Sequence, residues 1–274
     1  MGGGSSTPVT VEKKTELLGK PWRNVVTQTD LKQYLLDYKP TIDSVPQARI
    51  LLIGRLQAGK SSFFNSINSI FRGNITSQAG AGEMTTSLTL KVKAGRGGQP
   101  LAFLLCDTMG LEQTDHGGVN PKDIMSILKG CIPDEYRVRA VYLTSKTDSV
   151  LIAMSLLMKL CHLVMGYSIQ YFIINVIRDT FLLMFLDVPL VVLLTKVDRA
   201  CPLVEEDLEN VYRSCYIREL IKKASGCLGI AESNVLPVKN YSSEIELNDT
   251  CDILLLSAMK QMLNFADNYL DNFD

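Results

Sequence analysis

Residues 54–61 read GRLQAGKS and match the pattern GxxxxGK[ST] in full. Gly54 and Gly59 allow the backbone to bend so that successive N–H groups point into one cavity, where they can hold phosphate oxygens. Lys60 can reach the β- and γ-phosphates of a nucleotide, and the Ser61 hydroxyl can ligate Mg²⁺. The contacts to the nucleotide that we predict from this loop are Gly54, Gln57, Ala58, Gly59, Lys60, Ser61 and Ser62.

A second motif, TKVD at 195–198, indicates which base accompanies these phosphates. Asp198 can accept hydrogen bonds from N1–H and the N2 amine of guanine, whereas adenine lacks that pair of donors. Lys196 would lie along the base, and Thr195 would tie this loop to the phosphate loop. SKTD at 145–148 also follows an apolar run, but its serine fits the pattern [NT]KxD less well. We favour 195–198 and predict guanine.

A third motif, DTMG at 107–110, follows an apolar run and fits DxxG. Asp107 would hold a water on Mg²⁺, and the Gly110 N–H would bind the γ-phosphate, so the loop that follows would sense the state of the nucleotide. DHGG at 115–118 is a second match, but only Asp107 ends a predicted strand.

Thr85 and Thr86 precede an alternating strand pattern and are candidates to close over Mg²⁺. We select Thr85. The predicted metal ligands are Ser61, Thr85 and Asp107. The predicted catalytic residues are Lys60, Thr85, Asp107 and Gly110.

Two segments could support the guanine ring. NYS at 240–242 follows the short apolar run 235–238, whereas SAMK at 257–260 lies within a helical pattern. We favour the first segment, which adds Asn240 to the predicted nucleotide contacts.

Hydrolysis is less strongly indicated than binding. Small GTPases place a water-orienting glutamine directly after DxxG, and this chain has Leu111 there. We therefore expect weak hydrolysis of GTP to GDP. Arg55 or Gln57, inside the phosphate loop, could supply charge stabilisation across a homodimer or with a partner. An ordinary surface arginine and a solvated glutamine are the plainer interpretation of these two residues.

The elements that must position these motifs alternate between apolar strands and amphipathic helices. This alternation predicts an α/β fold, a three-layer P-loop NTPase (G domain) with a mainly parallel sheet. The expected strands are 48–53, 87–93 as an edge strand, 101–106, 188–194 and 235–238. The expected helices are a short one around 31–38 capped by Asp30, then 61–71 closed by Gly73, 120–130, 205–224 and 250–270. We divide the chain into a flexible tail at 1–20, a helical extension at 21–47 and a G domain at 48–274.

Composition excludes several other classes of protein. The 274 residues include 28 Lys and Arg against 29 Asp and Glu, so a partner bound through its phosphate backbone, such as nucleic acid, is not expected. Seven scattered cysteines without a CxxC pair, and two histidines, argue against zinc. They indicate reduced thiols in a cytoplasmic protein.

The first residues, MGGGSSTPVT, lack the apolar segment of a secretory signal. Gly2 and Ser6 fit a myristoylation pattern, although a flexible Gly/Ser tail explains them as well. One acyl chain anchors weakly. We expect contact with a membrane only if Gly2 is acylated or if 149–177 inserts.

Together, GRLQAGKSSFFNS, CDTMG, LLTKVDRACPLVEEDLENVYRS, VLPVKNYS and DILLLSAMKQMLNFADNYLDN resemble the interferon-induced protein 44 / 44-like family. The resemblance covers 21–136 and 188–274, and is to the short, fish-type members without a TLDc domain. It implies a GTP-binding P-loop domain, a cytoplasmic location, induction by interferon and a role in the antiviral immune response. It implies no defined reaction, so an interaction or assembly protein with a structural nucleotide site is the alternative.

Segment 138–187 departs from that family, whose members have a polar stretch and then a core strand here. We expect a buried helix with a substitute strand such as 171–177. An aberrant splice or gene-model product is an alternative. So is a membrane segment at 160–177, because those 18 residues lack Asp, Glu, Lys and Arg.

Overall fold

The computed structural model describes residues 16–24, 26–54, 57–78, 88–107, 150–156 and 189–273. For 88–90, 150–156 and 273 the description covers the backbone only.

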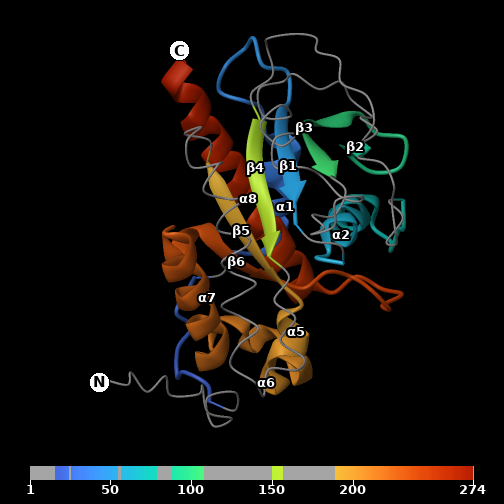
Figure 1. Ribbon diagram of the computed structural model, residues 1–274. Helices are drawn as coiled ribbons and strands as arrows, with labels where there is room; N and C mark the ends of the chain where they lie inside the picture. The colour runs from blue at the N-terminus through green and yellow to red at the C-terminus, as the bar shows by residue number, and fades with distance from the viewer. Residues whose placement is uncertain are drawn as a thin grey trace, which may run out of the picture.

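A six-stranded sheet forms the centre of the molecule (Figure 1). Its strands are β1 (Ala48–Ile53), β2 (Leu88–Lys93), β3 (Pro100–Asp107), β4 (Val150–Leu156), β5 (Leu190–Thr195) and β6 (Val235–Val238). Their spatial order is β2-β3-β1-β4-β5-β6. All neighbouring pairs are parallel except β2 with β3, so the antiparallel strand lies at the edge, where the alternating pattern predicted it.

Helices cover both faces of the sheet. One face packs against α1 (Gln28–Asp37), α2 (Lys60–Arg72) and α8 (Asp249–Leu270). The other packs against α5 (Val197–Ala200), α6 (Pro202–Glu206) and α7 (Cys215–Leu228). Alternate residues of β5 point to opposite faces, since Val191 and Leu193 join the first core and Val192 and Leu194 the second. The three-layer α/β fold predicted from the sequence is confirmed.

Short 3-10 helices also occur within the described residues. They are Leu208–Tyr212, Glu232–Asn234 and Asp271–Phe273.

Local sequence accounts for the ends of α2. Gly59 precedes it with a φ of 93°, and Gly73 follows it with a φ of 74°, so both glycines adopt the left-handed conformation that side chains disfavour. Between them Phe63, Phe64 and Ile67 are fully buried. The predicted helix and its closing glycine are therefore both present.

Two helix predictions need correction. The cap of α1 is Thr27 and not Asp30, because the Thr27 hydroxyl accepts the Asp30 N–H at 3.3 Å. The helix predicted at 205–224 is divided. Asp207 is extended and accepts the Glu209 N–H at 2.9 Å, and Ser214 then caps α7 by accepting the Ile217 N–H. Both side chains compete for backbone donors and so interrupt the helix.

The central strand of the divergent segment also lies elsewhere than predicted. β4 pairs in parallel with β1 on one side and with β5 on the other, so the gap is filled by 150–156. The predicted substitute, 171–177, lies outside the described residues. The seven residues of β4, VLIAMSL, are an apolar run of the kind expected for a central strand that pairs on both sides.

The chain before α1 lies against the residues that precede α7, on the other face of the sheet from α1. Leu18 N–H donates to Arg213 O at 2.8 Å, and Trp22 N–H donates to Tyr212 O at 3.0 Å. The Trp22 ring meets Tyr212 edge-on, with 5.1 Å between centroids. Residues 16–20, which we assigned to the tail, thus include backbone contacts with the start of α7.

Among the described residues, no helix has the length and apolar character needed to cross a membrane. The stretch 160–177 lies outside those residues. Residues 150–156, part of the segment 149–177 considered for insertion, form β4.

Candidate functional site

The predicted motifs meet at one edge of the sheet. Because β1, β3, β5 and β6 run in the same direction, their carboxyl ends lie at the same edge. The phosphate loop follows β1, Asp107 ends β3, and TKVD begins at the last residue of β5. In α/β sheets this edge is where ligands bind.

The phosphate loop leads from β1 directly into α2. Gln57 and Gly59 both have positive φ, 63° and 93°, so the backbone turns tightly before the first helical residue, Lys60. The φ of Gly59 disfavours any side chain, and an added Cβ would also lie 2.9 Å from Nδ2 of Asn240, which would have to move. The amino end of α2 faces this turn, and the positive end of a helix dipole suits an anion.

Lys60 is a charged residue held almost out of solvent, with 6% of its surface exposed. Its Nζ donates to the Gly54 carbonyl at 3.1 Å, across the loop. Burial lowers the pKa of Lys60, and the negative charge of Asp107 partly opposes that shift. A phosphate at this place would supply the negative charge that a buried ammonium needs.

Ser61 and Asp107 bring a hydroxyl and a carboxylate together. Ser61 Oγ donates to Asp107 Oδ2 at 2.5 Å, while Oδ1 is buried and makes no hydrogen bond within the described part of the chain. Burial raises the pKa of Asp107, which the Ser61 hydrogen bond and the Lys60 charge partly offset.

This pair suits Mg²⁺, which prefers oxygen ligands and is bound by one or two protein groups together with phosphate oxygens and water. The unpartnered Oδ1 of Asp107 is an acceptor that a water on the metal could use. The described residues contain no group of three His, Cys, Asp or Glu side chains that could hold a metal without the nucleotide.

The TKVD segment is joined to the phosphate loop by hydrogen bonds. Thr195 Oγ1 donates to the Ala58 carbonyl at 3.1 Å, and Lys196 Nζ donates to the Gln57 carbonyl at 3.5 Å. Lys196 has a φ of 59°, which turns the chain sharply into α5. Asp198 lies in the first turn of that helix.

Of the two segments considered for support of a guanine ring, only one lies at this edge. Asn240, after β6, donates from Nδ2 to the Gly59 carbonyl at 3.0 Å, and its Oδ1 is buried with no partner among the described residues. Residues 257–260 lie inside α8, where the Lys260 ammonium is placed over the Tyr34 ring of α1 at 4.8 Å.

The structure does not place every predicted residue. Ser62 lies in the first turn of α2. The residues that fall outside the described part of the chain are Arg55, Thr85, Thr86, Gly110, Leu111 and the rival segments 115–118 and 145–148.

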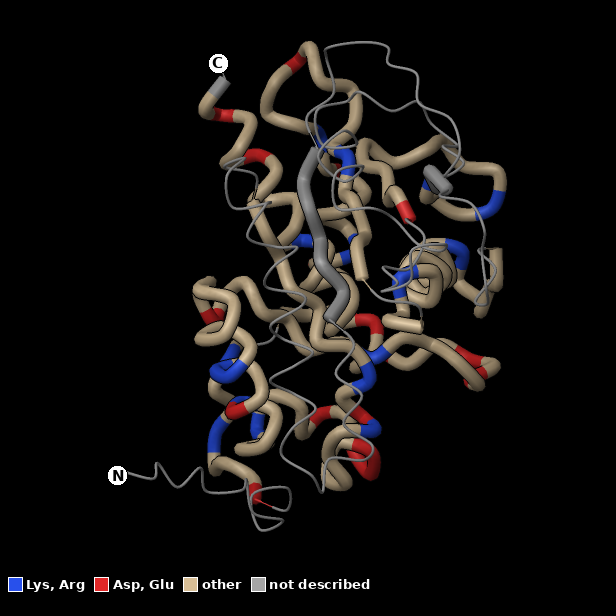
Figure 2. The backbone as a smooth tube through the Cα atoms, viewed as in Figure 1, with Lys and Arg blue, Asp and Glu red and all other residues tan. Residues whose placement is uncertain are grey.

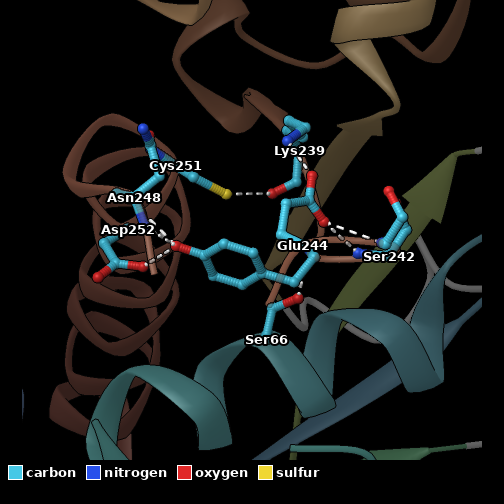
Figure 3. Close-up of polar contacts among 9 residues, drawn as sticks. Ser66, Lys239, Ser242, Glu244, Asn248, Cys251 and Asp252 are labelled. Carbon is cyan, nitrogen blue, oxygen red and sulfur yellow. Dashed lines mark hydrogen bonds and ion pairs between the residues drawn. The ribbon is translucent and has the colours of Figure 1, made fainter. Parts of the chain in front are cut away.

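A polar cluster behind the site was missed by sequence reasoning. It consists of Gln28, Ser66, Tyr241, Asn248 and Asp252, whose hydrogen bonds join α1, α2 and α8 to the residues after β6. Figure 3 shows Ser66 of α2 and, at the start of α8, Asn248 and Asp252 on either side of the tyrosine ring. The only sequence signal is Asp252, an acid that lies on the apolar face of a helix.

Charges of both signs are interspersed over the described part of the chain (Figure 2). Close to the site, burial lowers the pKa of Lys239, but the hydrogen bond to Glu244 and the nearby negative charges together outweigh burial and raise the pKa overall, with a small contribution from the charge of Asp198. Lys239 therefore belongs to the surroundings of the predicted base-reading residue.

The fold and the site together define a P-loop GTPase-like α/β protein, since the phosphate loop joins β1 to α2 and the TKVD segment ends β5. Two solved structures are similar to the chain at low identity. A probable GTP-binding protein engB is 12% identical and covers 81% of this chain and 100% of its own, with a TM-score of 0.43. Era from Aquifex aeolicus, bound to GDP and AlF₄⁻, is 16% identical and covers 80% and 57%, with a TM-score of 0.40.

The chain is homologous to interferon-induced proteins 44-like and 44, which confirms the resemblance seen in the sequence. Human interferon-induced protein 44-like is 39% identical over 253 residues, which are 86% of this chain and 55% of the relative. Human interferon-induced protein 44 is 36% identical over 267 residues, which are 91% of this chain and 60% of the relative. Mouse interferon-induced protein 44 is 34% identical over 263 residues, which are 90% of this chain and 61% of the relative. The chain thus spans less than two thirds of these relatives, and no family model matches it.

Proposed function

We propose that this chain binds GTP and GDP at the edge formed by the phosphate loop and the TKVD segment. The observation that carries the proposal is the hydrogen bond from Thr195 Oγ1 to the Ala58 carbonyl, 3.1 Å long. It joins the segment that ends in Asp198 to the loop that ends in Lys60. The hydrogen bond therefore keeps the base-binding group Asp198 and the phosphate-binding group Lys60 in a fixed arrangement, as the binding of one nucleotide by both requires.

The phosphate half of the site uses Gly54, Gly59, Lys60 and Ser61. Lys60 now donates to the Gly54 carbonyl and would exchange this acceptor for oxygens of the β- and γ-phosphates. Backbone N–H groups at the start of α2 would bind the remaining oxygens. Mg²⁺, when bound, would neutralise phosphate charge, and Ser61 and Asp107 would hold it with Thr85.

The base half of the site uses Asp198, Lys196 and Asn240. The Asp198 carboxylate would accept from two guanine donors, and an adenine there would leave it unsatisfied. Lys196 is already tied to the phosphate loop through the Gln57 carbonyl, so its aliphatic stem can lie along the ring. Asn240 is fixed by Gly59 and keeps Oδ1 as an acceptor.

Hydrolysis would be slow. Leu111 replaces the water-orienting glutamine, and the protein would need Arg55 or Gln57, or a partner, to stabilise the charge of the transition state. Leu111 also favours the second candidate function, an interaction protein whose nucleotide site does not hydrolyse GTP. Turnover measured over a hundredfold range of protein concentration separates these cases. A rate per site that rises with concentration supports action across a homodimer, and a constant rate excludes it.

We further propose that the protein acts in the interferon-induced antiviral response and lies in the cytoplasm. The names of the relatives support induction. We expect its amount to rise when cells of the source organism are treated with interferon, and cell fractionation to recover it outside membranes unless Gly2 is acylated. An unchanged amount after treatment would contradict the proposal.

Nucleotide affinity tests the central proposal. GTP, GDP and ATP should be titrated with and without Mg²⁺ against the wild type, Asp198→Ala and Lys60→Ala. We expect guanine nucleotides to bind more tightly than ATP, Asp198→Ala to remove this preference, and Lys60→Ala to weaken all three ligands. ATP affinity equal to that for GTP, or full GTP affinity in Asp198→Ala, would contradict the guanine assignment.

A further inference from the structure

The segment 239–244, which we call the base loop, is closed on itself after β6. The Glu244 carboxylate accepts the N–H groups of Ser242 at 2.7 Å and Ser243 at 3.1 Å, and it forms an ion pair with Lys239. The Cys251 thiol of α8 donates to the Lys239 carbonyl at 3.2 Å (Figure 3). These bonds keep the loop compact, and its position on the molecule depends on other contacts.

Tyr241 makes those contacts. Its N–H donates to Ser66 Oγ of α2 at 2.9 Å. Its hydroxyl lies 2.6 Å from Asp252 Oδ1, to which it donates, and it accepts the Asn248 N–H at 2.7 Å. Tyr241 follows Asn240, the residue bound to the Gly59 carbonyl, so a shift of the tyrosine displaces the contact with the phosphate loop.

Asp252 connects Tyr241 to the N-terminal helix α1. The residue is fully buried, at 0% exposure, so both carboxylate oxygens need protein donors. Oδ1 takes the Tyr241 hydroxyl, and Oδ2 takes Nε2 of Gln28 in α1 at 2.7 Å. Without the Gln28 donor the buried carboxylate would turn or draw the tyrosine hydroxyl toward Oδ2, because a buried acceptor without a partner is costly.

We propose that Gln28 is a positioning residue for the base loop, and that it acts through Asp252 and Tyr241 to set the affinity for guanine. This inference rests on the proposed function of the site. It makes the N-terminal helix, which lies before the phosphate loop in the chain, part of the apparatus that discriminates between bases.

The test compares Gln28→Leu with Tyr34→Phe. Both substitutions remove one hydrogen bond between α1 and α8, since Tyr34 Oη donates to Asn264 Oδ1 at 2.8 Å, but the Tyr34 contact lies far along α8 from the base loop. We expect Gln28→Leu to lower the affinity for GDP by about 3- to 10-fold and to leave the affinity for ADP nearly unchanged. For Tyr34→Phe we expect a change of less than about twofold in either ligand.

Exchange of donor and acceptor gives a rescue. Gln28→Glu alone places a second carboxylate against that of Asp252 and should lower the affinity for GDP. Combined with Asp252→Asn it places the acceptor on α1 and the amide donor on α8, while the side-chain oxygen of position 252 still faces Tyr241. We expect the double variant to recover most of the wild-type affinity for GDP. A double variant as weak as Gln28→Glu would contradict the proposed path.

Amide hydrogen exchange in the nucleotide-free protein separates this inference from the proposed function. Gln28→Leu should accelerate exchange in 239–248, and Tyr34→Phe should not. Equal loss of GDP affinity in both variants, or unchanged exchange in Gln28→Leu, overturns the inference. If the wild type binds no guanine nucleotide, the proposed function fails, and the exchange measurement alone then decides whether Gln28 holds the loop.

Discussion

Buried charges distinguish the candidate site at the scale of single residues. Lys60 and Asp107 are 6% and 5% exposed. Burial lowers the pKa of Lys60 and raises the pKa of Asp107, and both shifts favour the uncharged form of the side chain. Their charges partly compensate each other, and the Ser61 hydroxyl adds one hydrogen bond. Such an arrangement is less stable than an apolar core of the same volume, which is typical of a site that a ligand completes.

Asp107→Asn tests this interpretation. The raised pKa means that, above its usual pKa, the ionised carboxyl lowers the stability of the folded chain. We expect the melting temperature to stay unchanged or to rise, while the enhancement of GTP binding by Mg²⁺ is lost. A clearly lower melting temperature would show that the carboxylate stabilises the fold.

Cys251 should be chemically inert. Burial raises the pKa of its thiol to about 12, and the residue is fully buried. At about pH 8 we expect iodoacetamide to modify the partly exposed Cys227 before Cys251 in the native protein, because the thiolate is the reactive form. Peptide mass spectrometry measures both sites. Modification of Cys251 at the rate of Cys227 would show that α8 opens locally.

Glu244 gives a pH dependence to the base loop. Burial alone would raise its pKa, but hydrogen bonds from Lys239 and the Ser242 N–H lower it from the usual 4.5 to about 2. The stabilisation is therefore present above pH 4.5 and is lost as the pH falls toward 2. The NMR shifts of the Ser242 and Ser243 amides should titrate with a midpoint near the lower value. A midpoint at the usual value would mean that these bonds are absent in solution.

At the scale of elements, α8 connects the site with the rest of the core. Asn248 caps it by accepting the Cys251 N–H at 2.9 Å, and its first turns carry the buried Asp252. Further along, Asn264 and Asp267 accept the hydroxyls of Tyr34 and Tyr38. One helix therefore holds both the base loop and the N-terminal helix.

Asn248→Ala should lower the free energy of unfolding by about 1 kcal/mol, the usual effect of losing a helix cap. Asn272→Ala is the matched control, since its amide contact with the Asn268 carbonyl is exposed. Urea denaturation measures both variants. Equal effects would show that the cap contributes nothing specific to α8.

At the scale of the whole molecule, the N-terminal helix belongs to the main core. Leu31 and Leu35 of α1 are buried in the same cluster as residues of α2, α8 and the sheet. The segment that precedes α1 contacts the start of β6, where Arg23 Nη1 donates to the Val235 carbonyl at 3.0 Å. The extension that we separated at 21–47 thus packs with the G domain at two places.

Leu35→Ala should lower the free energy of unfolding by about 2–5 kcal/mol, since it opens a cavity in this shared core. Leu36→Ala, one residue on and 36% exposed, should change it by less than about 1 kcal/mol. Thermal unfolding followed by circular dichroism should show one transition in each case. Two separate transitions would show that α1 unfolds independently.

The sequence by itself determined the features that depend on neighbouring residues. The phosphate loop needs only its glycines, Lys60 and Ser61 in order, and the apolar runs at 48–53 and 188–194 suffice to predict buried strands. Periodicity likewise predicted α2 and α8, because the apolar residues of both segments recur at helical spacing.

Only the tertiary structure decided which of several equivalent segments was used and what lay against the site. Residues 150–156 and 171–177 are both apolar and of strand length, so the sequence does not distinguish them. In the structure it is 150–156 that pairs with β1 and β5. The division of 205–224 depends on Asp207 and Ser214 capturing backbone donors. The bonds of Gln28 to Asp252 and of Arg23 to Val235 join residues more than 200 positions apart. No local pattern encodes such contacts, because they form only when the sheet brings distant segments together.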